Sequence, residues 1–119
     1  MPTPVPPKQR AHRILRRLKC FRSEAQPPAD LELRPNDPLI GAIGEHAFLS
    51  ETGAYLSIGA GWQFTEYRDI AVAYPSKSNR GAPLVLRTPN GLAALLPGDP
   101  ELWEVGRFFM RCREDKRAA

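Results

Sequence analysis

Apolar residues near the end of the chain repeat at the three- and four-residue spacing of one helix face. The set comprises Leu102, Trp103, Val105, Phe108, Phe109, Met110 and Cys112. Asp99 can cap the free amides of a helix start, and Pro100 suits the first helical position because it has no N–H to lose. Acids come early and cations late, as the helix dipole favours. The pattern predicts a largely buried helix over residues 99–115, with Arg111 and Asp115 as an ion pair at i,i+4.

From residue 45 to residue 96 the apolar period changes to two, which is typical of β-strands. Turn residues divide this stretch into hairpins at 50–53, 59–61 and 88–91. The predicted strands cover residues 47–49, 55–58, 62–67, 70–74, 84–87 and 92–96. The expected fold class is α+β. A mainly antiparallel meander of six to seven strands forms a bent sheet or partly open barrel, and one C-terminal helix closes it.

The first 38 residues have a different composition. Residues 1–7 contain four prolines and are expected to form an extended, mobile tail. Over residues 8–22, five apolar side chains share one helical face and the other face is mostly cationic, which predicts a separate basic amphipathic helix. The five apolar residues are Ala11, Ile14, Leu15, Leu18 and Phe21. Residues 23–38 combine four more prolines with acids and are predicted to be a linker, so the β domain is expected over residues 39–119.

The size and charge of the chain limit the classes of protein it can belong to. With 119 residues, 42% of them hydrophobic and 25% charged, it suits one globular domain. The net charge of +4 is unevenly spread, because residues 8–22 carry seven cations and no acid, whereas residues 23–119 carry ten cations and thirteen acids. No secretory signal or membrane-spanning run is recognisable. We therefore expect a cytoplasmic protein with reduced thiols. The protein is expected to be either free in the cytoplasm or associated with a membrane surface.

The predicted order of elements, with the strands first and one Trp-containing helix last, resembles the pleckstrin-homology-like superfold, including its GRAM-like and bacterial members. Residues 47–56, 64–70 and 84–91 carry the resemblance and are similar to that family's first hairpin, its aromatic-x-Asp-Ile segment and its late hairpin. Trp103 matches the aromatic residue that the closing helix buries. Because that superfold usually has seven strands, residues 31–33 or 39–43 are expected to supply the seventh. Phosphoinositide binding does not carry over, because the first hairpin holds Glu51 and no cation.

The sequence argues against catalysis, metal binding and a cofactor. The two histidines and two cysteines are isolated, without the spacing that zinc ligands need. A triad of His46, Asp69 and either Ser50 or Ser57 is arithmetically possible, but a partly exposed strand residue is the simpler explanation of His46. Glu66 and Asp69 bracket a strand junction and are better explained as solvated carboxylates than as an acid/base pair. Cys20 lies among cations that would lower its pKa and make it reactive. The alternative is that Cys20 is an incidental thiol without a chemical role.

The basic segment of residues 8–22 carries the sharpest charge pattern. Four interpretations remain open: an apolar stripe packed on the domain or on a partner, a helix lying on an anionic membrane, a contact to nucleic-acid phosphates, or a targeting presequence. The residues expected to contact a membrane or another anionic partner are Arg10, Arg13, Arg16, Arg17, Lys19 and Arg22.

The leading functional hypothesis is a non-catalytic interaction or scaffolding module that binds a protein partner. An exposed strand edge can accept a partner peptide. A groove is also expected beside the C-terminal helix at Trp103 and Met110, which the core leaves partly uncovered. The alternatives are membrane recruitment through residues 8–22, nucleic-acid binding and neutralisation of a toxin.

Overall fold

The computed structural model describes residues 4–76, 82–95 and 101–118, and the eight strands of this part form two antiparallel sheets. The strands are β1 (Phe21–Arg22), β2 (Leu39–Ile43), β3 (Ala47–Ser50), β4 (Gly53–Ile58), β5 (Gly61–Glu66), β6 (Ala71–Ala73), β7 (Leu84–Thr88) and β8 (Gly91–Leu95). The helical elements are α1 (Pro7–Arg10), the π-helical turn η1 (Ala11–Leu15), the 3-10 turn η2 (Tyr67–Asp69) and α2 (Glu101–Ala118). The α+β class with one C-terminal helix is therefore confirmed.

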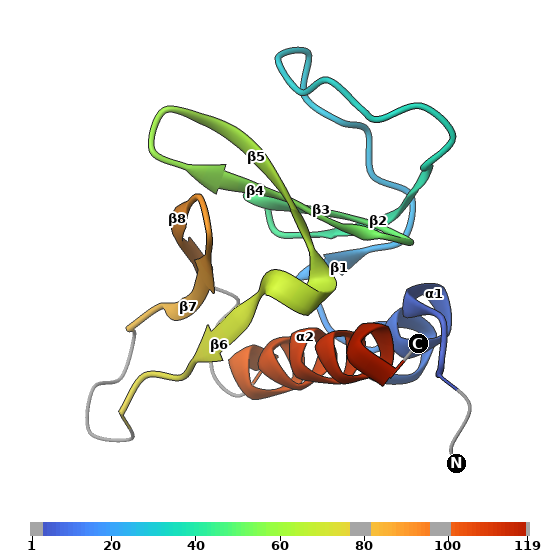
Figure 1. Ribbon diagram of the computed structural model, residues 1–119, viewed down its shortest axis with the longest axis vertical. Helices are drawn as coiled ribbons and strands as arrows, with labels where there is room; N and C mark the ends of the chain where they lie inside the picture. Colours follow the sequence, from blue (N-terminus) through green and yellow to red (C-terminus); the bar gives the residue numbers. More distant parts are fainter. Residues whose placement is uncertain (1–3, 77–81, 96–100, 119) are drawn as a thin grey trace.

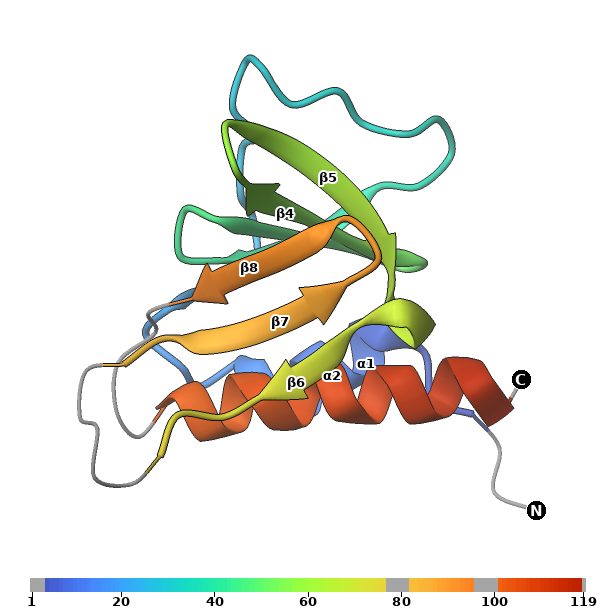
Figure 2. The same ribbon diagram turned by 60° about the vertical axis from the view of Figure 1, so that its left-hand side comes forward.

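The five-stranded sheet follows the chain, in the order β1-β2-β3-β4-β5. Figure 1 shows the hairpin of β7 and β8 beside this sheet, where β8 contacts β4. The three-stranded sheet, in the order β6-β7-β8, follows after η2, and no barrel closes in the described residues. Figure 2 shows α2 running beneath β6 and past α1, and α2 contacts η1, η2 and β6. The main core lies between the sheets and this helix.

All six predicted strands are present, with ends shifted by one or two residues. The further strand comes from Leu39–Ile43, which pairs with both β1 and β3. The alternative over residues 31–33 is wrong, because this stretch forms no strand. Instead Leu31 is buried in a second apolar cluster with Phe48 and Tyr55, on the sheet face that points away from the main core. The segment 23–38 thus covers the outer face, which is why the central strand β3 is buried on both sides.

The predicted helix over residues 8–22 is wrong in its extent. Helical structure spans α1 and η1 only, and β1 begins six residues after Leu15. Consecutive cations without acidic partners favour a short helix. Phe21 gains more from pairing with Ile43, where its ring lies against the backbone of Gly41. A Cβ at Gly41 would lie 2.5 Å from that ring, so this packing requires glycine.

The N-terminal helical segment is packed against the rest of the protein. Ala11, Ile14 and Leu15 are buried in the main core together with residues of α2. Arg10 Nε donates to Asp115 Oδ2 at 2.8 Å and a second nitrogen of its guanidinium donates to Oδ1 at 3.1 Å. Of the predicted tail, residues 1–3 lie outside the described part, and Pro7 already belongs to α1.

The closing helix has the predicted apolar face. Phe108 and Phe109 are fully buried and pack edge-to-face with ring centres 5.3 Å apart. The helix extends to Ala118, three residues beyond the predicted end, and the predicted cap at residues 99–100 lies outside the described residues. The predicted pair of Arg111 and Asp115 is wrong: Arg111 contacts Glu114 at 3.4 Å, since Asp115 is held by Arg10.

Candidate functional site

The predicted basic contact residues do not form one uniform surface. Arg10 is taken by Asp115, and that contact raises the pKa of the guanidinium. Arg22 donates to the carbonyl of Gly44, and the backbone N–H of Lys19 donates to Glu101 at 2.6 Å. The other predicted contact residues are Arg13, Arg16 and Arg17, all exposed. Arg10 is therefore a structural residue, while the other five still present charge.

The predicted groove residues of α2 both contact Tyr74, and Met110 stays 42% exposed. Trp103 stacks on Tyr74 with ring centres 5.0 Å apart, and the Tyr74 hydroxyl approaches Met110 Sδ at 3.3 Å. Gly106 permits this approach, since a Cβ there would lie 2.4 Å from the Tyr74 ring. Trp103 and Met110 line none of the three cavities described for this part of the chain.

No triad assembles among the described residues, where Ser57 meets His46 only through a backbone hydrogen bond of 3.1 Å. His46 precedes β3 and Ser50 ends it, so the length of the strand separates them. The Ser50 hydroxyl donates instead to Asp37 Oδ2 at 2.9 Å and accepts the N–H of Gly53 at 3.2 Å. The buried Tyr67 hydroxyl donates to the carbonyl of Ser50 at 2.7 Å. This polar cluster fixes the hairpin turn and anchors the segment that precedes β2.

The two thiols are free, and neither has the environment of a nucleophile. Burial, followed by the nearby Glu101 carboxylate, raises the pKa of Cys20 to about 11. Burial likewise raises the pKa of Cys112. The incidental thiol is therefore the better interpretation of Cys20, because burial and then Glu101 raise its pKa.

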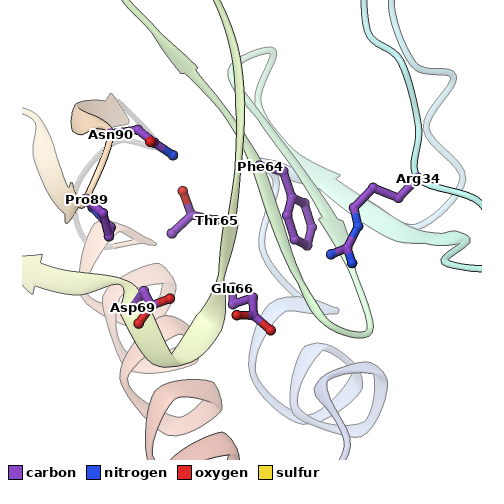
Figure 3. Close-up of a pocket in the computed structure, with 7 residues that line it drawn as sticks. All are labelled: Arg34, Phe64, Thr65, Glu66, Asp69, Pro89 and Asn90. Carbon is purple, nitrogen blue, oxygen red and sulfur yellow. The ribbon is translucent and has the colours of Figure 1, made fainter.

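The candidate site is a hollow of about 450 Å³ beside β5 (Figure 3). Its lining comes from the segment before β2, from β5, from η2 and from the turn between β7 and β8. The lining residues are Arg34, Phe64, Thr65, Glu66, Asp69, Pro89 and Asn90. Figure 3 shows Thr65 pointing from β5 toward the turn of Pro89 and Asn90, while Phe64 and Arg34 lie on the other side of the strand. The hollow therefore lies along the end of an edge strand.

The hydroxyl of Thr65 is the unusual group in this hollow. Thr65 is 4% exposed, and its Oγ1 has no hydrogen-bond partner among the described residues. A buried polar atom without a partner costs about 1–3 kcal/mol, and such atoms are rare in native proteins. Oγ1 is shielded from solvent, so a ligand in the hollow would remove that cost only by displacing the side chains that cover it.

The charged groups of the hollow are separated in space. Arg34 places its guanidinium carbon 4.2 Å from the centre of the Phe64 ring, a cation–π contact. The carboxylates of Glu66 and Asp69 are exposed, and Glu66 contacts Arg68 at 3.5 Å. Asp69 makes no ion pair within the described residues, so it is available to a basic group.

The sequence predicted several features that line this hollow, but it did not predict that they lie next to one another. Glu66, Asp69 and the turn at Pro89 and Asn90 were recognised separately. Arg34 lies 30 residues before Phe64 in the sequence, within a segment predicted to be a linker. The polar Thr65 on an inward-facing position of a strand was the one available signal, since inward positions are normally apolar.

Comparison of the chain with protein-family models, with curated proteins and with solved structures finds no match. Within the described ranges, no three side chains of His, Cys, Asp or Glu gather as a metal site would require. In the same part of the chain, every helix is too short or too polar to cross a bilayer. Function is therefore inferred from the chain's own residues and contacts.

Proposed function

We propose that the protein is a non-catalytic interaction module with pleckstrin-homology-like architecture, and that an extended segment of a protein partner binds along the open edge of β5. The observation that carries this proposal is the unpartnered hydroxyl of Thr65 in the hollow beside that edge.

The order of the elements supports the architectural part of the proposal. Strands β2 to β5 form a four-stranded meander, β6 to β8 form a second sheet, and α2 follows. Seven strands in two sheets, followed by one C-terminal helix, is the arrangement that the resemblance implies. The remaining strand, β1, is an addition of two residues at the edge of the first sheet.

The edge of β5 supports peptide binding. Six residue pairs join β5 to β4, from Gly53–Glu66 to Ile58–Gly61, while no strand of the described chain pairs with its other side. Backbone N–H and C=O groups on such an edge can pair with an added strand. Thr65 lies near the inner end of this strand, so an added peptide would lie beside it and would reach its buried hydroxyl once the side chains that cover it move aside.

Two of the three charged residues that line the hollow are carboxylates, and the third, Arg34, lies over the Phe64 ring, so the bound segment is expected to carry a basic side chain near Asp69. Asp69 and Glu66 offer carboxylates near the hollow, and the chain after residue 22 has more acids than cations. A Lys or Arg of the partner would donate to Thr65 Oγ1 or to Asp69, whereas an acidic side chain would be repelled.

The substitution Thr65→Val tests the proposal because it removes the hydroxyl and keeps the shape. We expect the free energy of unfolding to rise by about 1 kcal/mol, since an unpaired buried polar group is lost. Affinity for peptides selected from a displayed random library should fall about tenfold, as one hydrogen bond is lost. Urea unfolding and fluorescence titration provide the two measurements.

Ser50→Ala is the matched control, because the buried Ser50 hydroxyl donates to Asp37 at 2.9 Å and Ser50 does not line the hollow. This variant should lose stability and keep its affinity for the selected peptides. In NMR spectra of the labelled protein, the peptides should shift the amides of β5 and depend on a basic residue. Equal affinity of Thr65→Val and the unaltered protein, or shifts confined to another surface, would disprove the proposed site.

A further inference from the structure

A second hollow, of about 300 Å³, lies between the N-terminal helical segment and the first two strands. Its lining residues are Lys8, Ala11, His12, Arg16, Phe21, Ser23 and Ile40. Three of them carry basic side chains, three are apolar, and none is acidic. The hollow therefore combines a basic rim with an apolar floor.

The helical segment places the basic groups along one side of the hollow. Lys8, His12 and Arg16 are four residues apart and so share one face of the helical segment. The N–H of Arg16 bonds to the carbonyl of Ala11 at 3.1 Å, which is the wider spacing of a π-helical turn. π-helical turns are rare overall, and those that do occur often lie at functional sites. Arg16 and His12 also meet, with 3.0 Å between a guanidinium nitrogen and Nε2.

The strands supply the apolar floor. Ala11 is buried, while Phe21 and Ile40 are half-buried and pack at the border of the main core. The ring of Phe21 is held in place because it lies directly on Gly41. The floor is therefore built from rigid elements and not from a loose side chain.

The positive charge of this region is not neutralised within the described part of the protein. Of the seven cations in residues 8–22, Arg10 alone forms an ion pair there, with Asp115. Cations left unpaired around a concave surface concentrate a positive potential, which attracts anions. The hollow has the size of the smaller known ligand pockets.

We propose that this hollow binds a small anionic amphiphile. Its phosphate or carboxylate lies against Lys8, His12 and Arg16, and its hydrocarbon part lies on Ala11, Phe21 and Ile40. Binding is independent of the peptide site, because β5 contributes no residue to this hollow. The same chemistry is found in soluble alkyl phosphates and in anionic lipids, and the experiment separates these two sources.

The probe is octyl phosphate, titrated into the full chain by calorimetry, with inorganic phosphate and octanol as partial ligands. We expect octyl phosphate to bind and each partial ligand to bind at least tenfold more weakly. Lys8→Gln and Arg16→Gln should each lower the affinity about tenfold, since each removes a charge-assisted hydrogen bond. Thermal unfolding of each variant verifies the fold, which these exposed residues should not affect.

Arg13→Gln and Arg17→Gln are matched controls, because both residues are exposed and neither lines the hollow. They should leave the affinity within about twofold of the unaltered value. An equal loss in all four variants would overturn the proposal in favour of general charge attraction. Absence of octyl phosphate binding would overturn it as well.

Vesicles of phosphatidylcholine, with and without phosphatidylserine, form the second arm. Two results together would assign the hollow to a lipid. Octyl phosphate displaces the protein from the anionic vesicles, and Arg16→Gln weakens vesicle binding more than Arg17→Gln does. Octyl phosphate binding without vesicle binding assigns it to a soluble amphiphile. Vesicle binding that octyl phosphate does not displace would mean that the membrane meets another surface, and a hollow that binds octyl phosphate would then be assigned to a soluble amphiphile.

Discussion

At the scale of single residues, two buried hydroxyls show opposite situations. Ser50 is fully buried and satisfied, since it bonds to Asp37 and to the backbone of Gly53. Thr65 is almost as deeply buried and has no partner within the described chain. The first arrangement stabilises the fold, whereas the second costs free energy, and the proposed peptide would offset that cost by supplying a partner.

Ser50→Ala should lower the free energy of unfolding by about 1–3 kcal/mol, because the buried Asp37 carboxylate and the Gly53 N–H both lose a partner. Urea denaturation monitored by Trp fluorescence measures the change. Ser57→Ala, in the half-exposed part of β4, is the control and should stay within about 0.5 kcal/mol. A neutral Ser50→Ala would mean that water replaces the lost hydrogen bonds.

At the scale of elements, the basic N-terminal segment combines two roles. One face, with Ala11, Ile14 and Leu15, is part of the main core, while Arg13 and Arg17 point to solvent. Because the element is only nine residues long, from Pro7 to Leu15, it would be marginal as an isolated helix. Its stability comes from packing on α2, so folding and the presentation of its cations are linked.

Ile14→Ala should reduce the free energy of unfolding by about 2–4 kcal/mol, since Ile14 is 7% exposed and truncation leaves a cavity against α2. Arg13→Ala, one residue earlier and exposed, should change it by less than about 0.5 kcal/mol. Chemical denaturation of both variants gives the comparison. Similar small effects would indicate that the segment is detached from the domain in solution.

At the scale of the whole molecule, one ion pair joins the two ends of the chain. Arg10 and Asp115 are 105 positions apart, and their side chains are only 20% and 12% exposed. Partial burial alone would raise the pKa of Asp115, but hydrogen bonds from Arg10 and from the backbone of Val5 outweigh it and lower the pKa. The folded protein therefore holds this carboxylate ionised more strongly than the unfolded chain does.

The sign of the pH effect follows from that lowered pKa. The stabilisation from Asp115 is fully present above the unfolded carboxyl value of about 4 and is lost as the pH falls through the lower folded value. Asp115→Asn should cost about 1–3 kcal/mol near neutral pH and progressively less in acid. Urea unfolding as a function of pH measures this, with the exposed Glu114→Gln as a control that shows little change.

The sequence by itself determined the local elements of this protein. The period of two predicted six strands, and the capping residues, charge order and apolar face predicted α2, because these signals depend on near neighbours in the chain. It also identified Glu66, Asp69 and the Pro89–Asn90 turn as separate features. The extent of the N-terminal helix was predicted wrongly because Phe21 pairs with β2 instead of continuing the helical face.

Only the tertiary structure decided which of these features meet. It buried Leu31 against Phe48, joined Arg10 to Asp115 and brought Arg34 to Phe64 across 30 residues. It also left the Thr65 hydroxyl unpaired at the edge of β5. Such contacts depend on how sheets and helices pack in three dimensions, and residue spacing along the chain carries no record of them. Both hollows are lined by residues that lie far apart in the sequence, so only the tertiary structure reveals them.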